Sequence, residues 1–390
     1  MSERIPMIPP YKVISRVQIL AETKDYNHEL MNIPAMWKKT RGALTDGTGI
    51  PVVILDSGVP NHVDLKPSGG RSFIPGYEED QNGHSTHCGG IIAAVANNGM
   101  GVAGIAPDCA DYYGAVLDKN GSGDIQQICD GIRWAVDEIG ARVISMSLGI
   151  PAGYATFKKM EEAVNYATSH GVAVICAAGN EAGGVGQPAC YESAIAVAAV
   201  NDKKQHARFS NSGPEVDFAS GGVNVYSTYL KNGYAKLSGT SMACPALAGV
   251  ATLIIADEKN DTGKWLTPAE LVEKMKRIAF DVGDDGFDET FGHGIPVFRS
   301  GKGEPDEPEQ PGEPDEPETP EEPEKPTDPA DPGKIKKNNF PCGLTWKVLS
   351  AFSESADRAA RNGADPDGAI LAGLQAVGEF ATKATEARRQ

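Results

Sequence analysis

Between residues 46 and about 300, short apolar runs of strand character alternate with amphipathic runs of helix character, and this alternation restricts the fold. The helix-like runs include residues 123–140 and 156–171. Buried strands separated by helices predict an α/β fold in three layers, with a mainly parallel central sheet flanked by helices. Ligands bind such sheets beyond the carboxyl ends of the strands. The strand-like runs end there in small or polar residues; they are PVVILD (51–56), ARVISMSLG (141–149), GVAVICAAGN (171–180) and AIAVAAV (194–200).

The composition changes sharply after residue 300, and we expect four segments. They are an N-terminal extension with an inhibitory role (1–45), the α/β domain (46–300), a Pro/Glu-rich linker (301–334) and a helical tail (335–390). In the linker a proline stands at every third position from Pro305 to Pro332, ten in all, and acidic residues fill most of the other positions. A polyproline II helix has three residues per turn, so the pattern predicts a stiff, solvated spacer. The alternative is a docking site for a domain that binds PxxP motifs.

The tail carries apolar residues at helical spacing on both sides of a turn, NGADPDG (362–368). Two amphipathic helices of this length bury little surface by themselves. We therefore expect residues 335–390 to pack on each other and on a further surface. That surface would belong to a second copy of the chain, to the α/β domain or to a partner protein.

The formal net charge is −17, and residues 303–334 contribute −11 of it through 13 acidic residues and 2 lysines. Nucleic-acid binding needs clustered Lys and Arg, so the composition argues against a nucleic-acid partner. The first residues contain no apolar signal-peptide core, and no run reaches the roughly 18 apolar residues of a membrane span. Seven scattered cysteines without a CxxC pair argue against zinc and favour a reduced, cytoplasmic protein.

Three short motifs place polar residues at the ends of apolar runs. Asp56 ends the strand-like run in VVILDSG, and His84 precedes a helix-like run in QNGHSTHCGG. Ser241 precedes a buried helix that we expect to begin near Ala243. Singly, each has a structural explanation as a turn residue, a helix start or a helix cap, and we interpret His87 in that structural way. Together, an Asp, a His and a Ser in this order along an α/β chain match the order of the subtilisin triad.

The motifs DSG, NGHSTHCGG and SGTSMACP closely resemble the three signatures of the subtilisin-like serine proteases. NNGMGVAGIAP, NGSG, SMSLG and AAGN lie between them in that family's order, so the resemblance covers about residues 45–300. It implies a serine endopeptidase in which Ser241 attacks a peptide carbonyl, His84 takes its proton and Asp56 orients His84. It also implies an oxyanion hole formed by the side-chain amide of Asn180 and the backbone N–H of Ser241. The substrates would be peptides or unfolded proteins.

The resemblance also implies which residues bind substrate. Two uncharged walls of the primary pocket and one edge that pairs with an extended peptide are expected. These residues are Gly121, Ser122, Gly123, Ser147, Leu148, Gly149, Ala177, Ala178 and Gly179. Because the walls carry no charge, we expect the pocket to take an apolar or uncharged side chain.

A structural calcium site is implied in the same way. Carboxylate, amide and backbone carbonyl oxygens suit calcium better than a transition metal. The alternative is a Gly-rich turn without a metal. The implied ligands are Asp64, Ala96, Asn98, Met100 and Val102.

In layout the chain most resembles the intracellular subtilisins, which begin with a short extension containing a Leu-Ile-Pro-Tyr-like patch. Here IPMIPPY (5–11) is similar, with an additional proline. We expect this segment to lie across the substrate cleft as an inhibitor; the alternative is an arm that packs on the domain. Two residues depart from the family pattern, Ser85 in place of Gly and Ala246 in place of His. Cys88 and Cys244 are expected near the catalytic His and Ser.

Two other functions stay open from the residues alone. A subtilisin fold could be retained as a catalytically silent scaffold or binding protein, although the intact Asp56, His84, Asn180 and Ser241 argue against this. A peptide ligase or macrocyclase on the same fold would share the acyl-enzyme intermediate, so the sequence does not separate it from a hydrolase.

Overall fold

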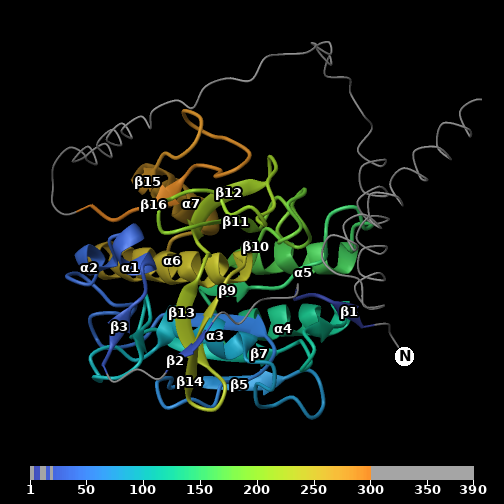
Figure 1. Cartoon of the computed structure of the whole chain (residues 1–390), viewed down its shortest axis with the longest axis horizontal. Coiled ribbons are helices and arrows are strands. Elements are labelled where there is room, and N and C mark those ends of the chain that lie inside the picture. Colours follow the sequence, from blue (N-terminus) through green and yellow to red (C-terminus); the bar gives the residue numbers. More distant parts are fainter. Residues whose placement is uncertain (1–3, 9–14, 18–20, 300–390) are drawn as a thin grey trace, which may run out of the picture. The chain divides into compact units, whose positions relative to one another are not determined.

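The computed structural model describes residues 4–8, 15–17 and 21–299, and its centre is a sheet of seven parallel strands (Figure 1). The strand order across the sheet is β12-β11-β10-β9-β4-β7-β5. The linker and tail predicted at 301–334 and 335–390 lie outside the described residues. The strands are β4 (Pro51–Asp56), β5 (Gly69–Ser72), β7 (Ala110–Ala115), β9 (Val143–Met146), β10 (Ala173–Ala177), β11 (Ile195–Val200) and β12 (Val216–Gly221).

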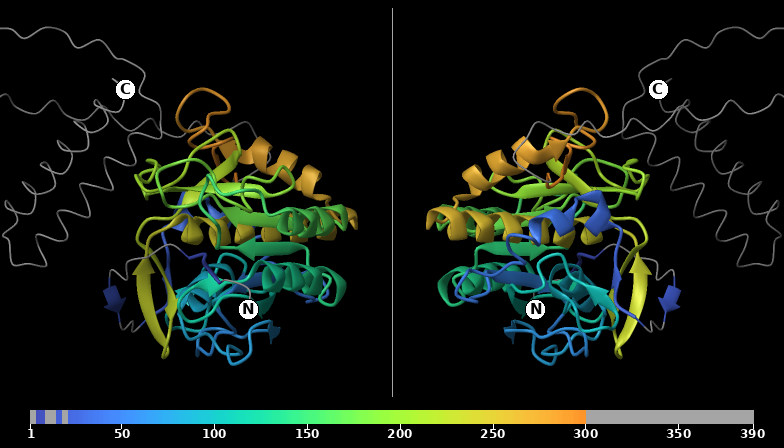
Figure 2. Two further views of the ribbon diagram at one scale, coloured as in Figure 1. Left: turned by 90° about the vertical axis from the view of Figure 1, so that its right-hand side faces the viewer. Right: turned by 90° about the vertical axis from the view of Figure 1, so that its left-hand side faces the viewer.

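Two pairs of helices cover the sheet (Figure 2). Helices α3 (His84–Ala93) and α6 (Thr240–Thr262) pack against each other, α3 on β4 and β7 and α6 on β9 to β12. Helices α4 (Ile125–Asp137) and α5 (Lys158–Ser169) form the other pair, on β4 and β10. Every residue of β9 and β10 is buried, which requires cover on both faces of the sheet. The predicted three-layer α/β fold is thus confirmed.

Shorter elements surround this unit, and the described part of the 1–45 segment packs into it. Met31 and Ile33 have no exposed surface, and Phe298 N–H donates to the carbonyl of Met31. The boundary at residue 45 stays a prediction. The remaining helices are α1 (Asn27–Leu30), α2 (Ile33–Met36) and α7 (Pro268–Ile278), and the remaining strands are β1 (Ile5–Pro6), β2 (Ser15–Val17), β3 (Thr23–Lys24), β6 (Val102–Ala103), β8 (Ser122–Gly123), β13 (Val225–Tyr229), β14 (Gly233–Leu237), β15 (Ala279–Phe280) and β16 (Ile295–Pro296).

Helix α6 begins at Thr240, so the expected start near Ala243 was wrong by one turn. Its first N–H groups lack intrahelical partners, and the side-chain oxygen of Asn180 accepts the N–H of Thr240 at 2.8 Å. This cap comes from the end of β10, 60 residues earlier, and local sequence does not reveal it.

Among the described helices α6 is also long and apolar enough to cross a membrane, but 94% of that stretch is buried inside the protein.

Candidate active site

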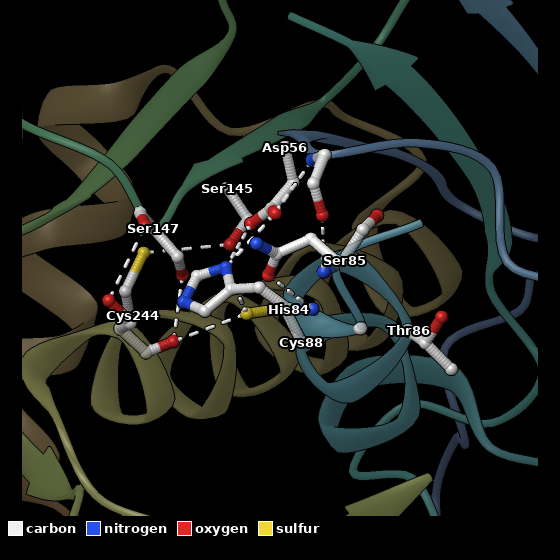
Figure 3. Close-up of polar contacts among 12 residues, drawn as sticks. Asp56, His84, Ser85, Thr86, Cys88, Ser145, Ser147 and Cys244 are labelled. Atoms are coloured by element: carbon white, nitrogen blue, oxygen red, sulfur yellow. Dashed lines mark hydrogen bonds and ion pairs between the residues drawn. The ribbon is translucent and has the colours of Figure 1, made fainter. Parts of the chain in front are cut away.

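Asp56 and His84 form a fully buried pair where β4 ends and α3 begins. His84 Nδ1 lies 2.8 Å from Asp56 Oδ2 and 3.0 Å from Asp56 Oδ1 (Figure 3). The N–H of Ser57 donates to the same carboxylate at 2.7 Å, which fixes its orientation. A carboxylate facing Nδ1 holds the proton on that nitrogen and leaves Nε2 as the basic atom of the ring.

The electrostatics of His84 favour a protonated ring more than those of an ordinary histidine. Burial, the largest single influence, lowers the pKa of His84, but Asp56 and Cys88 together outweigh it, and the pKa lies well above 6.5. The Cys88 thiol lies 3.8 Å from Nδ1, and burial raises the pKa of that thiol. By contrast, burial lowers the pKa of His87 to about 3, and that ring contacts the carbonyls of Val225 and Ala235. His84 therefore has the chemistry of a base, and His87 has a structural environment.

The backbone around His84 tolerates few side chains. Gly83, which precedes the helix, has φ +96°, and a Cβ there would lie 2.6 Å from the ring of Tyr229. Ser85, where the related family has glycine, is fully buried and donates its hydroxyl to the carbonyl of Gly58 at 2.5 Å. This departure from the family pattern is accommodated by a hydrogen bond.

Ser241 lies in the first turn of α6, beside the end of β9. Its hydroxyl donates to the carbonyl of Ser147 at 3.4 Å, which is a weak hydrogen bond. Pro245, four residues later, has no N–H to donate to the carbonyl of Ser241. The hydroxyl of Ser147 donates to that carbonyl at 2.8 Å, and the Cys88 thiol donates to it at 3.4 Å. Because of the proline, the carbonyl of Ser241 makes no helical hydrogen bond to residue 245. Ser147 and Cys88 bind this carbonyl instead and so fix the backbone of Ser241.

Asn180, three residues beyond the end of β10, also contacts the start of α6. Its side-chain oxygen accepts from the backbone N–H and the hydroxyl of Thr240, at 2.8 and 2.9 Å. With the oxygen held there, the amide Nδ2 lies on the side of Gly239, 3.2 Å from where a Cβ of residue 239 would be. The arrangement fixes one side-chain N–H donor close to the backbone N–H of Ser241.

A hollow beside Ser241 brings together most of the predicted pocket residues. Ala177, Ala178 and Gly179 line one part of it, and Leu148 and Gly149 another. Ser147 contacts Ser241 directly. The predicted wall residues are uncharged, and Glu181, the residue after Asn180, lines the hollow beside them. Its carboxylate accepts the N–H of Asn180 at 3.0 Å and the side-chain amide of Asn211 at 2.8 Å.

The predicted peptide-binding edge, Gly121 to Gly123, is paired with the chain's own N-terminal residues. Strand β1 runs antiparallel to β8, with Ile5 opposite Gly123 and Pro6 opposite Ser122. The N–H of Met7 donates to the carbonyl of Gly121 at 2.9 Å. The N–H of Gly149, on the other side, donates to the carbonyl of Met7 at 2.9 Å. Residues 5–8 therefore lie between two predicted substrate-binding edges.

The predicted calcium ligands lie partly together in the structure. Asn98 donates its amide to Asp64 Oδ1 at 2.5 Å, and the N–H of Val102 donates to Asp64 Oδ2 at 2.9 Å. Met100 belongs to the same turn, since its N–H donates to Asn98 Oδ1 at 2.9 Å. Ala96 is buried next to this loop, but its contacts do not test a role as ligand.

Two residues beside this loop were missed by the sequence analysis. Glu22 accepts the N–H of Asn98 at 2.9 Å, and the hydroxyl of Tyr234 donates to Asp64 at 3.2 Å. Glu22 arrives by the pairing of β3 with β6, and Tyr234 by the β13–β14 hairpin. No local motif marks either residue, because both contacts arise from distant parts of the chain.

Known proteins resemble this chain in sequence over most of the described domain. A model of the subtilase family matches residues 47–294. Alkaline elastase YaB of Bacillus sp. (strain YaB) is 44% identical over 253 residues, which are 64% of this chain and 63% of that protein. The thermostable alkaline protease of Halalkalibacterium halodurans is 48% identical over 212 residues, 53% of this chain and 57% of that protein. The chain thus spans less than two thirds of the length of these two relatives.

A third relative is covered more completely. Subtilisin Savinase of Lederbergia lenta is 42% identical over 240 residues, which are 61% of this chain and 86% of that protein. The family model covers more than half of the chain and includes Asp56, His84, Asn180 and Ser241. The chain belongs to the subtilase family.

Proposed function

We propose that the chain is a serine endopeptidase that cleaves peptides or unfolded proteins through an acyl-enzyme. The observation that carries this proposal is the buried pairing of His84 with Asp56, at the same end of the sheet as Ser241. A buried carboxylate that fixes one imidazole nitrogen and leaves the other as a base is the arrangement that serine proteases require. Membership of the subtilase family supports the same activity.

In this mechanism Ser241 attacks the peptide carbonyl while His84 Nε2 accepts the hydroxyl proton and then passes it to the leaving amine. Asp56 holds the tautomer and stabilises the imidazolium that forms. The Ser241 N–H and the Asn180 amide stabilise the oxyanion. For subtilisin itself, removal of the corresponding asparagine costs about 100- to 1000-fold in kcat. Because its pKa is raised, His84 becomes a base at a higher pH than an ordinary histidine does.

Hydrolysis is tested against ligation by identifying the products. The purified chain is incubated with an unfolded protein, alone and with an added amine nucleophile, and intact masses are recorded. We expect products that carry a free carboxyl group even when the amine is present, because water then resolves the acyl-enzyme. Predominant amide products would favour the ligase. If no cleavage occurs even after the N-terminus is trimmed and calcium is supplied, the silent scaffold is favoured.

We further propose that residues 5–8 restrain the enzyme by occupying the substrate cleft. Their backbone bonds to Gly121 and Gly149 are those expected of an extended substrate, and Met7 is almost fully buried beside the hollow that contains Ser241. The close fit at Gly121 supports an occupied cleft, since a Cβ there would lie 2.9 Å from Ile8. The prolines at positions 9 and 10 lie outside the described residues.

A structural calcium ion at the loop around Asp64 is also proposed. Asp64 is fully buried, and burial raises the pKa of its carboxyl, so a bound cation would offset the unfavourable desolvation. Carboxylate and amide oxygens of Asp64 and Asn98 would hold the ion together with backbone carbonyls of the loop, and Glu22 would add a second carboxylate.

Calcium removal is expected to lower the melting temperature by about 5–10 °C, if the ion was present at about 100 times its dissociation constant. Thermal unfolding with calcium and with a chelator measures the shift. Asp64→Asn should lose most of this response, while Asp111→Asn, a buried carboxylate that accepts from Tyr113 instead, should keep it. Equal melting temperatures with and without calcium in the unmodified protein would contradict the site.

A reducing, cytoplasmic setting is likewise kept as a proposal. The six cysteines of the described residues are free thiols, which is typical of proteins in that compartment. A role of residues 335–390 in self-association or partner docking is proposed from their amphipathic pattern alone.

A further inference from the structure

Asp118 is a nearly buried carboxylate at the upstream end of the peptide-binding edge. Its side chain is 11% exposed. One oxygen, Oδ1, accepts the N–H groups of Asn120 and Ser122 at 2.8 and 3.0 Å. The second oxygen, Oδ2, is 3.1 Å from Nη1 of Arg4. Backbone donors thus hold the carboxylate, and a cation from the N-terminal segment occupies its remaining face.

Arg4 continues the strand that lies in the cleft. Ile5 pairs with Gly123, and Met7 bonds to Gly121 and to Gly149. Arg4 is therefore three residues upstream of the residue that is buried beside the hollow containing Ser241. A peptide that replaces the segment along the same edge would bring its own residue to Asp118 in the same register.

We propose that Asp118 forms an acidic subsite that selects substrates with Arg or Lys three residues before the residue that takes the place of Met7. The inference rests on the proposed function, since it assumes that substrates use the edge occupied by residues 5–7. Among the ion pairs of the described residues, Arg4 is the one cation on Asp118. When residues 4–8 leave the cleft, the Asp118 carboxylate keeps its two N–H donors but loses the positive charge of Arg4. A basic side chain of the substrate would replace that positive charge.

The expected preference is moderate. Arg4 keeps 37% of its side chain exposed, so solvent and salt weaken the attraction. We expect Arg to be preferred over Gln by about two- to fivefold in kcat/KM at low ionic strength, with a smaller ratio at high salt. The neighbouring Lys119 carries the opposite charge, so the attraction belongs to Asp118 itself and not to a broad acidic patch.

The test compares internally quenched peptides that differ at one position, Xaa-Ile-Pro-Met followed by alanines, with Arg, Gln or Glu as Xaa. The full chain is used, and cleavage sites are confirmed by mass. Because the fraction of molecules with an open cleft multiplies kcat/KM for every peptide, it cancels in the ratio of two peptides. The Arg-to-Gln ratio therefore reports the subsite even if the N-terminal segment slows all reactions.

Asp118→Asn is expected to bring the Arg-to-Gln ratio to about 1, since the amide oxygen still accepts from Asn120 and Ser122 but carries no charge. Asp118→Lys is expected to prefer the Glu peptide. Asp130→Asn, with the same loss of charge at an exposed position of α4, should keep the wild-type ratio.

The outcomes separate the two proposals. A wild-type ratio near 1, with cleavage that depends on Ser241, overturns the acidic subsite and leaves the protease. If no peptide is cleaved even after the N-terminus is trimmed and calcium is supplied, the protease proposal fails, and amide hydrogen exchange tests the remaining contact. Exchange at the amides of Ile5, Met7 and Ile8 should be faster in full-length Asp118→Asn than in the wild type, and equal exchange would show that Asp118 does not hold the segment.

Discussion

Ser241→Ala is expected to lower kcat for peptide cleavage by about 10⁶-fold, the size of the loss measured when the equivalent serine of subtilisin is removed. The reason is that the acyl-enzyme cannot form without the hydroxyl, while the oxyanion donors remain. The measurement is cleavage of an unfolded protein or a quenched peptide by purified wild type and variant at equal concentration. The residual rate would reflect only substrate binding and the oxyanion hole.

The structure predicts that this variant folds. The hydroxyl of Ser241 makes a long bond of 3.4 Å, so little stability is lost with it. The bonds that hold this turn from Ser147 and Cys88 go to the backbone carbonyl, which alanine keeps. Melting temperatures of variant and wild type should therefore agree within about 2 °C, since the loss of one long hydrogen bond changes the stability by about 0.5 kcal/mol.

Ser220→Ala is a matched control. Ser220 is buried and donates its hydroxyl to the carbonyl of Ala243 at 2.7 Å, in the same helix as Ser241. Its removal should reduce stability by about 1 kcal/mol and keep kcat within about tenfold. If Ser241→Ala cleaves as fast as the wild type, or if Ser220→Ala is equally inactive, the assignment of the nucleophile is wrong.

The layered fold, and the position of candidate site residues at the ends of strands, can be predicted from the sequence, because both depend on local patterns. Strand-like runs that end at Asp56 and near Asn180 place these residues at one edge of a parallel sheet, and the structure bears out that placement.

Contacts between distant segments are what the sequence analysis missed. Glu22 reaches Asn98 across 76 residues, and Arg4 reaches Asp118 across 114. The start of α6 depends on a cap from Asn180. Each of these depends on pairing of strands or on packing that no short motif encodes, so a single sequence offers no signal for them.

Met7→Asp is expected to raise the activity of the full chain by about 10- to 100-fold. Met7 has 1% of its surface exposed, and burial of a methionine side chain stabilises by about 1.5–3 kcal/mol relative to exposure. Each 1.4 kcal/mol is a factor of ten in the equilibrium between closed and open cleft. Loss of the burial energy of Met7 therefore raises the ratio of open to closed molecules by about 10- to 100-fold. The rise ends when the open form predominates. Initial rates on a short quenched peptide measure the effect.

The controls separate release of the N-terminal segment from a change elsewhere. Met7→Leu has nearly the same volume and no charge, so it should keep the low activity of the wild type. Met7→Asp combined with Ser241→Ala should be inactive, which assigns the gained activity to Ser241. If Met7→Asp and wild type cleave at equal rates while both hydrolyse the peptide, residues 5–8 do not restrain the enzyme. The bonds of Met7 to Gly121 and Gly149 would then belong to an arm that substrates displace without cost.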